Sequence, residues 1–351
     1  MILLNFINQN FNKNAIFIYN LHYSYSMKED NLYKLDLRDK KLLFELDKNS
    51  RESLSNLAKI LKTSKEVIYY RLNNLINNKI ILKFHTVPAT YRFGLTAYKV
   101  YLRLSDYSDE DYKKIIDFLN SHKDVFWIGI CKGRWDLIFG IWAKNLEEFF
   151  QIHDSILHKF SKFIQEKELS ISRENFQYNR RWMYYDKSPI VEFNFGEKEP
   201  NIEIDEKSKK ILDELIQDSR KSIVDIAEKT KLSIDIIRYR IKAMEKEGII
   251  KGYKCLLNPS KVGFTTCKAF VFFKNITDIK KKEFIDYCKH LSNTINIITT
   301  FAPWDLEIMF ETSGYEEYFK IMDSIKNKFN DIIRFYESLM ITGEPKQVFA
   351  K

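Results

Sequence analysis

The sequence predicts an α+β protein made of two similar repeats, each with a helical part followed by a part of mixed strands and helices. Two observations predict this. Identical residues recur at one constant spacing over most of the chain, and inside each repeat the apolar period changes from that of helices to that of strands. The chain has 351 residues, 45% of them hydrophobic, which is enough for several packed cores.

The repeat holds one register throughout. Arg51 recurs as Arg220, a spacing of 169 residues. The same spacing relates Lys41 to Lys210, Leu46 to Leu215, Ala58 to Ala227, Gly94 to Gly263, Trp135 to Trp304 and Asp136 to Asp305. Two homologous units therefore follow one another without a net gap, each of about 150 residues, which is one to two small domains.

Each repeat begins with three short amphipathic helices. In the first repeat, Asp36, Ser53 and Ser64 are placed to cap them, and Lys62 with Thr63 makes the turn before the third helix. A helix, a tight turn and a helix with a polar, basic outer face is the helix-turn-helix arrangement. The short β-prone stretch 80–85 that follows predicts the wing of a winged helix.

A period of two then predicts strands. The expected elements are a strand from Tyr98 to Leu104, a helix over 109–122, strands over 125–131 and 135–143, a helix over 145–161 and a strand over 164–172. The order βαββαβ is the ferredoxin-like fold. Because these strands are apolar on both faces, helices can cover only one side of the sheet. We expect the other side to be covered by the second repeat, in an intrachain pseudo-dimer, and homo-oligomers are compatible with this arrangement.

These patterns set the expected domain boundaries. The predicted domains are an N-terminal tail (1–33), a first winged helix-turn-helix (34–93), a first ferredoxin-like domain (94–174), a linker (175–201), a second winged helix-turn-helix (202–263) and a second ferredoxin-like domain (264–351). Residues 1–26 fit neither repeat, so we expect either a true start at Met27 or a poorly ordered tail. In the linker, Arg180, Arg181 and Trp182 suit nucleic-acid contact or packing on the neighbouring sheet, and we favour packing.

The positive charge of the chain lies on the helix-turn-helix segments. Residues 34–93 hold 13 basic and 6 acidic side chains, and 202–263 hold 14 and 11, whereas 94–186 and 264–351 are each balanced. This distribution favours a polyanion partner, double-stranded DNA, bound by the helical parts.

The third helix of each repeat supplies the expected DNA contacts. With its apolar positions facing inward, it turns polar side chains outward, and Asn can read adenine while Lys and Arg reach guanine or phosphate. The predicted DNA-binding residues are Lys65, Tyr69, Tyr70, Asn73 and Asn74 in the first repeat and Asp235, Arg238, Tyr239 and Lys242 in the second. Since the two faces differ, we predict unlike half-sites. Arg51 and Arg220 are expected to support helix packing and nearby phosphates.

Other classes of protein are not indicated. The four cysteines lack any C-x-x-C spacing, which speaks against a zinc site or a disulfide framework and fits a reducing cytoplasm. No apolar run reaches the roughly 18 residues of a membrane helix. No Gly-rich phosphate loop, metal cluster or nucleophile–base pair is present, so we predict no cofactor and no enzyme activity.

The second repeat carries a family resemblance. Residues 211–264 read ILDELIQDSRKSIVDIAEKTKLSIDIIRYRIKAMEKEGIIKGYKCLLNPSKVGF, with Leu-Ser opening the third helix and Glu-Gly-Ile-Ile-x-Gly-Tyr entering the wing. This resembles the Lrp/AsnC family of transcriptional regulators, and the first repeat follows the pattern more loosely. The chain therefore looks like a fused tandem member. The resemblance implies sequence-specific DNA binding and a ferredoxin-like domain that senses a small, amino-acid-like ligand.

The resemblance also implies an effector site. Family sensors often place a Gly-x-x-Asp loop between the second and third strands, and Gly133-Arg134-Trp135-Asp136 matches it. The second repeat has Ala302-Pro303-Trp304-Asp305, without the glycine. The implied effector-binding residues are Gly133, Arg134, Trp135, Asp136, Trp304 and Asp305. Core packing is the alternative for both tryptophans.

Two other functions are compatible with parts of the sequence. Siroheme decarboxylases of haem synthesis are similar in fold and sometimes fused in tandem, but no ordered His/Arg set stands out here. A protein-interaction scaffold that no longer binds DNA is the second alternative, best suited to the less basic second helix-turn-helix. We favour the regulator.

Overall fold

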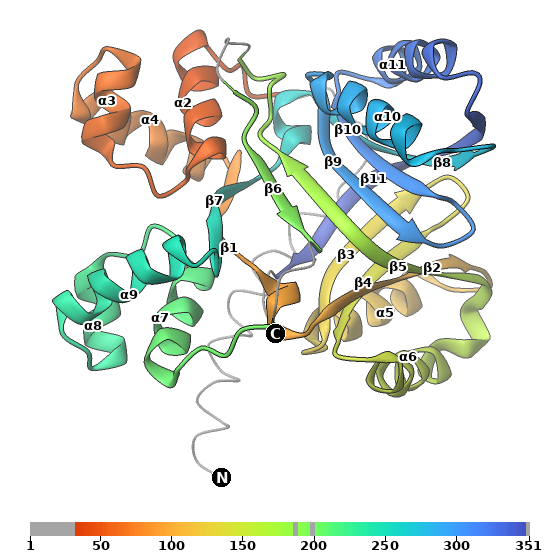
Figure 1. Ribbon diagram of the computed structural model, residues 1–351, viewed down its shortest axis with the longest axis horizontal. Coiled ribbons are helices and arrows are strands. Elements are labelled where there is room, and N and C mark those ends of the chain that lie inside the picture. The colour runs from red at the N-terminus through yellow and green to blue at the C-terminus, as the bar shows by residue number, and fades with distance from the viewer. Residues whose placement is uncertain (1–31, 185–188, 197–200, 349–351) are drawn as a thin grey trace.

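A computed structural model describes residues 32–184, 189–196 and 201–348. The expected tail lies almost wholly outside the described residues, and so does Met27. Two helical units lie on one side of the molecule, and two sheets covered by helices lie on the other (Figure 1). No helix among the described residues is long and apolar enough to cross a membrane.

Each helical unit holds three helices. Their bounds are α2 Leu37–Lys48, α3 Leu54–Leu61 and α4 Lys65–Asn77 in the first repeat, and α7 Glu206–Gln217, α8 Ile223–Thr230 and α9 Ile234–Lys246 in the second. The predicted caps are confirmed: the side chains of Asp36, Ser53 and Ser64 each accept a hydrogen bond from the backbone N–H three residues on. Lys62 ends α3 in the left-handed conformation, which makes the tight turn before α4.

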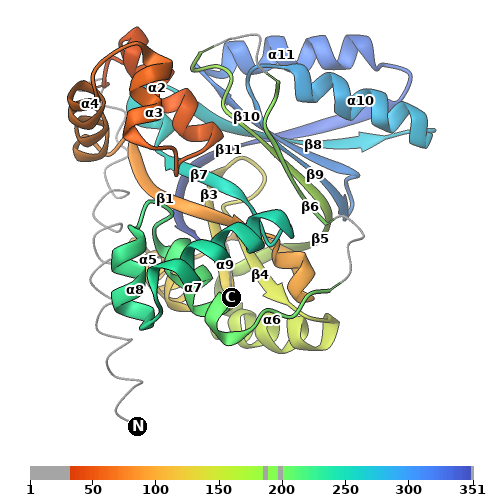
Figure 2. The same cartoon turned by 60° about the vertical axis from the view of Figure 1, so that its left-hand side comes forward.

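The two wings pair with each other. Strand β1 (Ile81–Pro88) and strand β7 (Ile250–Leu257) form an antiparallel two-stranded ribbon between the helical units (Figure 2). Each unit also packs on the strand of the other repeat. Cys255 of β7 belongs to the core of the first helical unit, and the Thr86 hydroxyl of β1 donates to the Leu215 carbonyl of α7, at 2.8 Å. The ribbon therefore makes the two helical units one body.

Each repeat continues with the predicted βαββαβ order. The first has β2 Thr96–Leu104, α5 Asp109–Ser121, β3 Val125–Lys132, β4 Leu137–Ala143, α6 Leu146–Phe160 and β5 Ile164–Tyr178. The second has β8 Thr265–Phe273, α10 Asp278–His290, β9 Thr294–Phe301, β10 Leu306–Thr312, α11 Tyr315–Lys328 and β11 Ile333–Gln347.

The eight strands of the two repeats close into a ring, and we call its half β5-β2-β4-β3 the first sheet and its half β11-β8-β10-β9 the second sheet. The order is β2-β4-β3-β11-β8-β10-β9-β5, and β5 returns to β2, while the short strand β6 (Glu192–Phe195) attaches to β5. The long strands make the joins: β5 pairs with β2 up to Ile171 and with β9 from there to Gln177, and β11 does the same with β8 and β3. The stretch assigned to a linker thus contains the end of β5 and all of β6, because pairing with the other repeat extends the strand.

Apolar side chains fill both faces of the sheets. In β4, Leu137, Phe139 and Ile141 pack under α5 and α6, while Ile138 faces the interior of the ring. The interior cluster draws on both repeats, and its buried members are Tyr101, Trp127, Cys131, Trp135, Ile138, Phe270, Phe272, Trp304, Leu339 and Ile341. The alternation read from the sequence therefore separates a helix-covered face from an interior face.

Candidate DNA-binding surface and sheet interior

Helix α4 presents a polar face to solvent. Ile68, Leu72 and Leu75 are buried against the unit, which turns Lys65 and Tyr69 outward. Tyr70 lies beside them and is 72% exposed, so its ring and hydroxyl are accessible to a ligand. An exposed helix with Tyr and Lys side chains, capped at its N-terminus by Ser64, suits the major groove of DNA.

The two asparagines of α4 have different surroundings. Asn74 donates its side-chain amide to the Tyr33 hydroxyl at 2.6 Å, and its carbonyl oxygen accepts from the Asn78 amide at 2.9 Å. These contacts occupy both ends of the Asn74 amide. Asn73 is half-buried on the outward side of the helix. Of the two, Asn73 is therefore the better candidate to read a base.

Helix α9 presents a different polar face. Asp235, Arg238, Tyr239 and Lys242 are all exposed, and Tyr239 is 74% exposed. Arg238 lies 3.8 Å from the Asp235 carboxylate, and both side chains are largely in water, so this pair contributes little stability. The predicted DNA-binding residues thus gather on one exposed face of each third helix, with Asn74 the member already engaged inside the protein.

Arginines hold each third helix on its first helix. Arg71 of α4 donates to Asp36 at 2.8 Å and to Asp39 at 2.7 Å. Arg240, its counterpart in α9, donates to Asp205 and Ser208. These contacts hold each third helix against the N-terminal end of the first helix of its unit.

Arg51 and Arg220 join the two helical units. Arg220 donates to the backbone carbonyls of Ser50 and Glu52 at 2.6 and 2.8 Å, and Arg51 donates in return to the carbonyls of Ser219 and Lys221. The Ser50 and Ser219 hydroxyls lie 2.8 Å apart between them. The expectation that these arginines support packing therefore agrees with the structure, but the packing they support is between repeats.

The loop matched to the effector site is built into the sheet. Gly133 has φ +140°, and a Cβ there would lie 3.2 Å from the Leu339 Cβ. The Asp136 carboxylate accepts from the Leu104 backbone N–H at 2.8 Å, and Asp305 accepts from Phe273 N–H at the same distance. Both aspartates thus hold a neighbouring strand.

The remaining residues of this loop divide between core and surface. Trp135 and Trp304 are buried in the ring interior. Arg134 is 42% exposed, and its guanidinium reaches Glu166 of β5 at 2.8 Å and Glu337 of β11 at 3.2 Å. Arg134 is therefore the charged side chain of this set that stays accessible to a ligand.

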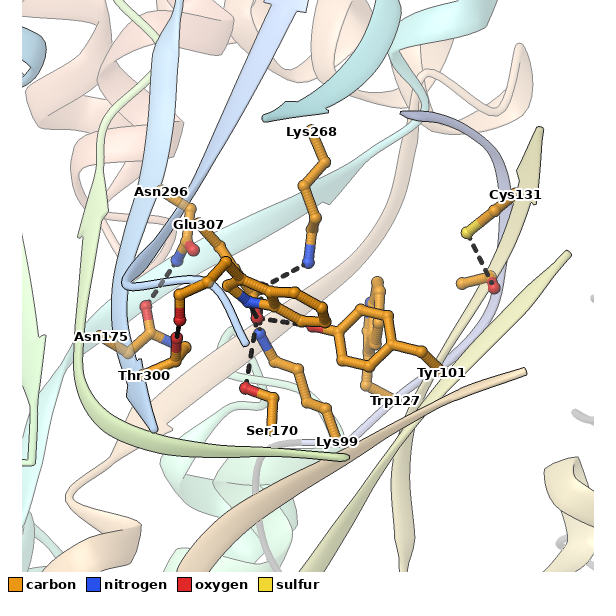
Figure 3. Close-up of polar contacts among 12 residues, drawn as sticks. Lys99, Tyr101, Trp127, Cys131, Ser170, Asn175, Lys268, Asn296, Thr300 and Glu307 are labelled. Carbon is orange, nitrogen blue, oxygen red and sulfur yellow. Dashed lines mark hydrogen bonds and ion pairs between the residues drawn. The ribbon is translucent and has the colours of Figure 1, made fainter. Parts of the chain in front are cut away.

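A charged cluster that sequence reasoning missed lies inside the ring (Figure 3). The Lys99 and Lys268 ammonium groups each donate to the same Glu307 oxygen, Oε2, at 2.7 Å. The other oxygen, Oε1, accepts from the Tyr101 hydroxyl at 2.5 Å and from Trp304 Nε1 at 3.3 Å. Glu307 and Tyr101 have no exposed surface.

Burial and neighbouring charges shift the ionisation of this cluster. Burial opposes the charge on Glu307, but the two ammonium groups outweigh it and hold the pKa of this carboxyl well below its usual range. Burial also lowers the pKa of Lys99 to about 8, because desolvation and the charge of Lys268 outweigh the attraction of Glu307. The one sequence signal was that Lys99 and Lys268 correspond at the repeat spacing, inside strands otherwise apolar on both faces.

Arg180 is part of a second buried ion network. It donates to Asp47 of α2 and to Glu311 of β10, both at 2.9 Å, and Trp182 Nε1 donates to Glu311 at 2.7 Å. The Trp182 ring stacks on Phe264 with centroids 3.7 Å apart. Arg180 and Trp182 are therefore engaged in joining the first helical unit to the second sheet, which agrees with the packing favoured for them over contact with nucleic acid.

Comparisons with known proteins bear on both parts of the molecule. A family model described as winged helix-turn-helix DNA-binding matches residues 204–251. An uncharacterized HTH-type transcriptional regulator of Pyrococcus furiosus is 34% identical over 121 residues, which is 34% of this chain and 79% of that protein. LrpA of Pyrococcus horikoshii, an HTH-type transcriptional regulator, is 44% identical over 62 residues, 18% of this chain and 44% of LrpA.

The whole fold is similar to a solved structure of an enzyme. The siroheme decarboxylase NirDL aligns over 90% of this chain and 94% of its own, with a TM-score of 0.58 and 13% sequence identity. At that identity the similarity concerns the fold alone.

Proposed function

Because the chain belongs to the Lrp/AsnC family of HTH-type transcriptional regulators, we propose that it binds specific duplex DNA sequences with α4 and α9. The observation that carries the proposal is the pair of exposed third helices on two units that β1, β7, Arg51 and Arg220 hold together. We further propose that it acts in the cytoplasm, where such a regulator would meet its DNA.

The two helices read different half-sites. On α4, Asn73 suits a two-point contact with adenine, and Lys65 reaches guanine or phosphate. On α9, Arg238 suits guanine, while Lys242 contacts phosphate and Asp235 disfavours acceptor-rich positions. Tyr70 and Tyr239, at equivalent and highly exposed positions, donate to phosphate on each half-site. Half-site centres lie about 10 bp apart or a multiple of it if both helices meet one face of DNA.

The ferredoxin-like domains form an intrachain pseudo-dimer that takes a small amino-acid-like effector. Pairing of β5 with β9 and of β11 with β3 supports the first part. For the second, Arg134 is the residue we assign to the effector carboxylate, in competition with Glu166 and Glu337. Binding there would separate the ends of β5 and β11, the two strands that join the sheets.

The pseudo-dimer has a direct test. Ser172 of β5 is opposite Thr300 of β9 in the register of the two strands. In the Ser172→Cys/Thr300→Cys variant, a short thiol cross-linker should give a product of single-chain mass. A product of double mass would mean that the sheets pair between chains.

The effector assignment is tested by thermal unfolding with single amino acids. An amino acid that binds should raise the melting temperature of the wild type and not that of Arg134→Ala. Lys132→Ala, next to the same loop, is the control for a loss of positive charge. A shift that persists in Arg134→Ala places the effector elsewhere.

Siroheme decarboxylation is the alternative, and the NirDL fold similarity is the observation that favours it. Against it, Tyr101, Trp135, Phe270 and Trp304 fill the ring interior and pack on one another, with the Tyr101 and Trp304 ring centroids 4.8 Å apart. Loss of carboxylate from siroheme on incubation with the protein would establish the enzyme.

Selection of bound DNA from a random duplex pool, at two salt concentrations, tests the regulator. We expect an enriched motif with two unlike half-sites that persists at the higher salt. A single half-site would show that one helix-turn-helix has no role in readout. No enrichment, with weak binding that salt abolishes, would contradict the proposal and leave a scaffold or an enzyme.

A further inference from the structure

The ring of strands maps onto itself when the repeats are exchanged. Its order, β2-β4-β3-β11 followed by β8-β10-β9-β5, places each strand of one repeat where its counterpart stands in the other. Lys99 of β2 and Lys268 of β8 are such counterparts, and both are buried in the interior. Because both contact one oxygen of Glu307 at 2.7 Å, that oxygen lies close to the approximate two-fold axis relating the repeats (Figure 3).

The other members of the cluster break this symmetry. Glu307 of the second repeat corresponds to Ile138 in the first, so only one carboxylate lies between the two lysines. The hydroxyl donors come from the first repeat alone: Tyr101 corresponds to Phe270, and Ser170 corresponds to Leu339. The second repeat thus supplies the carboxylate acceptor, and the first repeat supplies the hydroxyl donors.

We propose that this cluster is a pairing determinant, through which the inner face of the first sheet accepts the second sheet and rejects a copy of itself. Two first sheets would bury two Lys99 ammonium groups with no carboxylate. Two second sheets would bring two Glu307 carboxylates side by side at the axis, together with their two Lys268 ammonium groups. Only the mixed pair puts one carboxylate between two ammonium groups.

The energetics favour a role in specificity. Removing one partner from a buried ion group leaves an uncompensated charge and is strongly destabilising, whereas replacing the whole group by apolar side chains is often neutral or better. Buried charge is therefore a poor means of gaining stability but an effective means of excluding wrong partners. The inference rests on the intrachain pairing proposed above, which the Ser172–Thr300 cross-link tests separately.

The experiment moves the carboxylate across the axis in the full-length chain. Glu307→Ile should raise the unfolding equilibrium constant about a hundredfold or more in urea denaturation. Ile138→Glu alone should also destabilise, because two carboxylates then meet at the axis. The double variant Ile138→Glu/Glu307→Ile should recover much of the loss, since position 138 stands in the same relation to both lysines as position 307.

Two further variants keep the test decisive. Ile141→Glu/Glu307→Ile has the composition of the transfer variant, but its carboxylate lies in the core under α5 and α6, so it should not recover. The apolar variant Lys99→Met/Lys268→Met/Glu307→Leu should fold even if Glu307→Ile does not, and light scattering should show chain-to-chain species absent from wild type. The proposal is overturned if transfer gives no recovery or if the apolar variant keeps the wild-type mass.

Discussion

At the scale of single residues, the contacts of two neighbouring asparagines of α4 give them different predicted roles, one in reading a base and one in stabilising the helical unit. Asn73→Ala should weaken binding to the selected operator by about 1–3 kcal/mol and relax the preference at one base position. Asn74→Ala should instead lower the stability of the first helical unit, because it removes the contact with Tyr33. Titration of single-base operator variants measures the difference. Equal weakening on every sequence would make Asn73 a phosphate contact.

Arg238 of α9 offers the matching prediction for the second repeat. Arg238→Ala should cost about 1–3 kcal/mol at one base pair of the other half-site. Lys242→Ala, a loss of the same charge from the same face, should weaken all sequences alike and reduce the salt dependence by about one phosphate. If the two variants show the same base preference and the same salt dependence of binding, α9 does not read bases through Arg238.

Lys99 gives a pH dependence with a definite sign. Its pKa is lowered to about 8 in the folded chain by burial, against an ordinary value of 10.5, so between these pH values the unfolded chain binds more protons. The free energy of unfolding should therefore rise as pH increases from about 8 to 10.5, by up to about 3 kcal/mol from this group. Below pH 8 both states carry the proton, and the contribution is constant.

Comparison with Lys99→Met isolates this effect. The charged groups near Lys99 are Lys268 and Glu307, with Glu344 of β11 beside Lys268. Burial also lowers the pKa of Lys346 to about 8, so the variant should lose only part of the rise in urea-denaturation stability. If the free energy of unfolding rises equally with pH in the wild type and the variant, the proton that the folded chain releases belongs to a group other than Lys99.

At the scale of elements, the turns between the first and second helices of each unit couple the two units. Arg51→Ala and Arg220→Ala should each cost about 1–3 kcal/mol, because each guanidinium loses two carbonyl acceptors. The double variant should cost less than the sum, since both changes loosen one interface. Arg38→Ala, an exposed arginine of α2, is the control and should change little. Strict additivity would show that the arginines act independently.

Local elements were predictable because their signals are local. Caps at Asp36, Ser53 and Ser64, and the alternation of Leu137 with Ile138, follow from propensities and periods that neighbouring residues define. The ring was not predictable in detail, because the pairing of β5 with β9 joins residues more than 100 positions apart. The interior cluster was missed because a lone Lys99 or Glu307 in a strand ordinarily indicates a solvent-facing position.

At the scale of the whole molecule, the repeat allows the sequence of the predicted operator to be changed by substituting the outward residues of one helix. The ribbon of β1 and β7 relates the two units by an approximate two-fold, so the asymmetry of the predicted operator arises from the outward residues of α4 and α9 alone. At the repeat spacing, Ile234, Asp235, Arg238 and Lys242 occupy the positions of Lys65, Glu66, Tyr69 and Asn73.

Giving α9 the face of α4 should therefore make the operator symmetric. The variant Ile234→Lys/Asp235→Glu/Arg238→Tyr/Lys242→Asn changes exposed positions only, so the fold and the spacing between units should remain. Selection from the random pool should then return two inverted copies of the first half-site at the wild-type spacing, because half-site geometry mirrors the symmetry of the protein. An unchanged asymmetric motif would mean that α9 does not read DNA, and that the asymmetry arises from the first repeat and the deformability of the DNA.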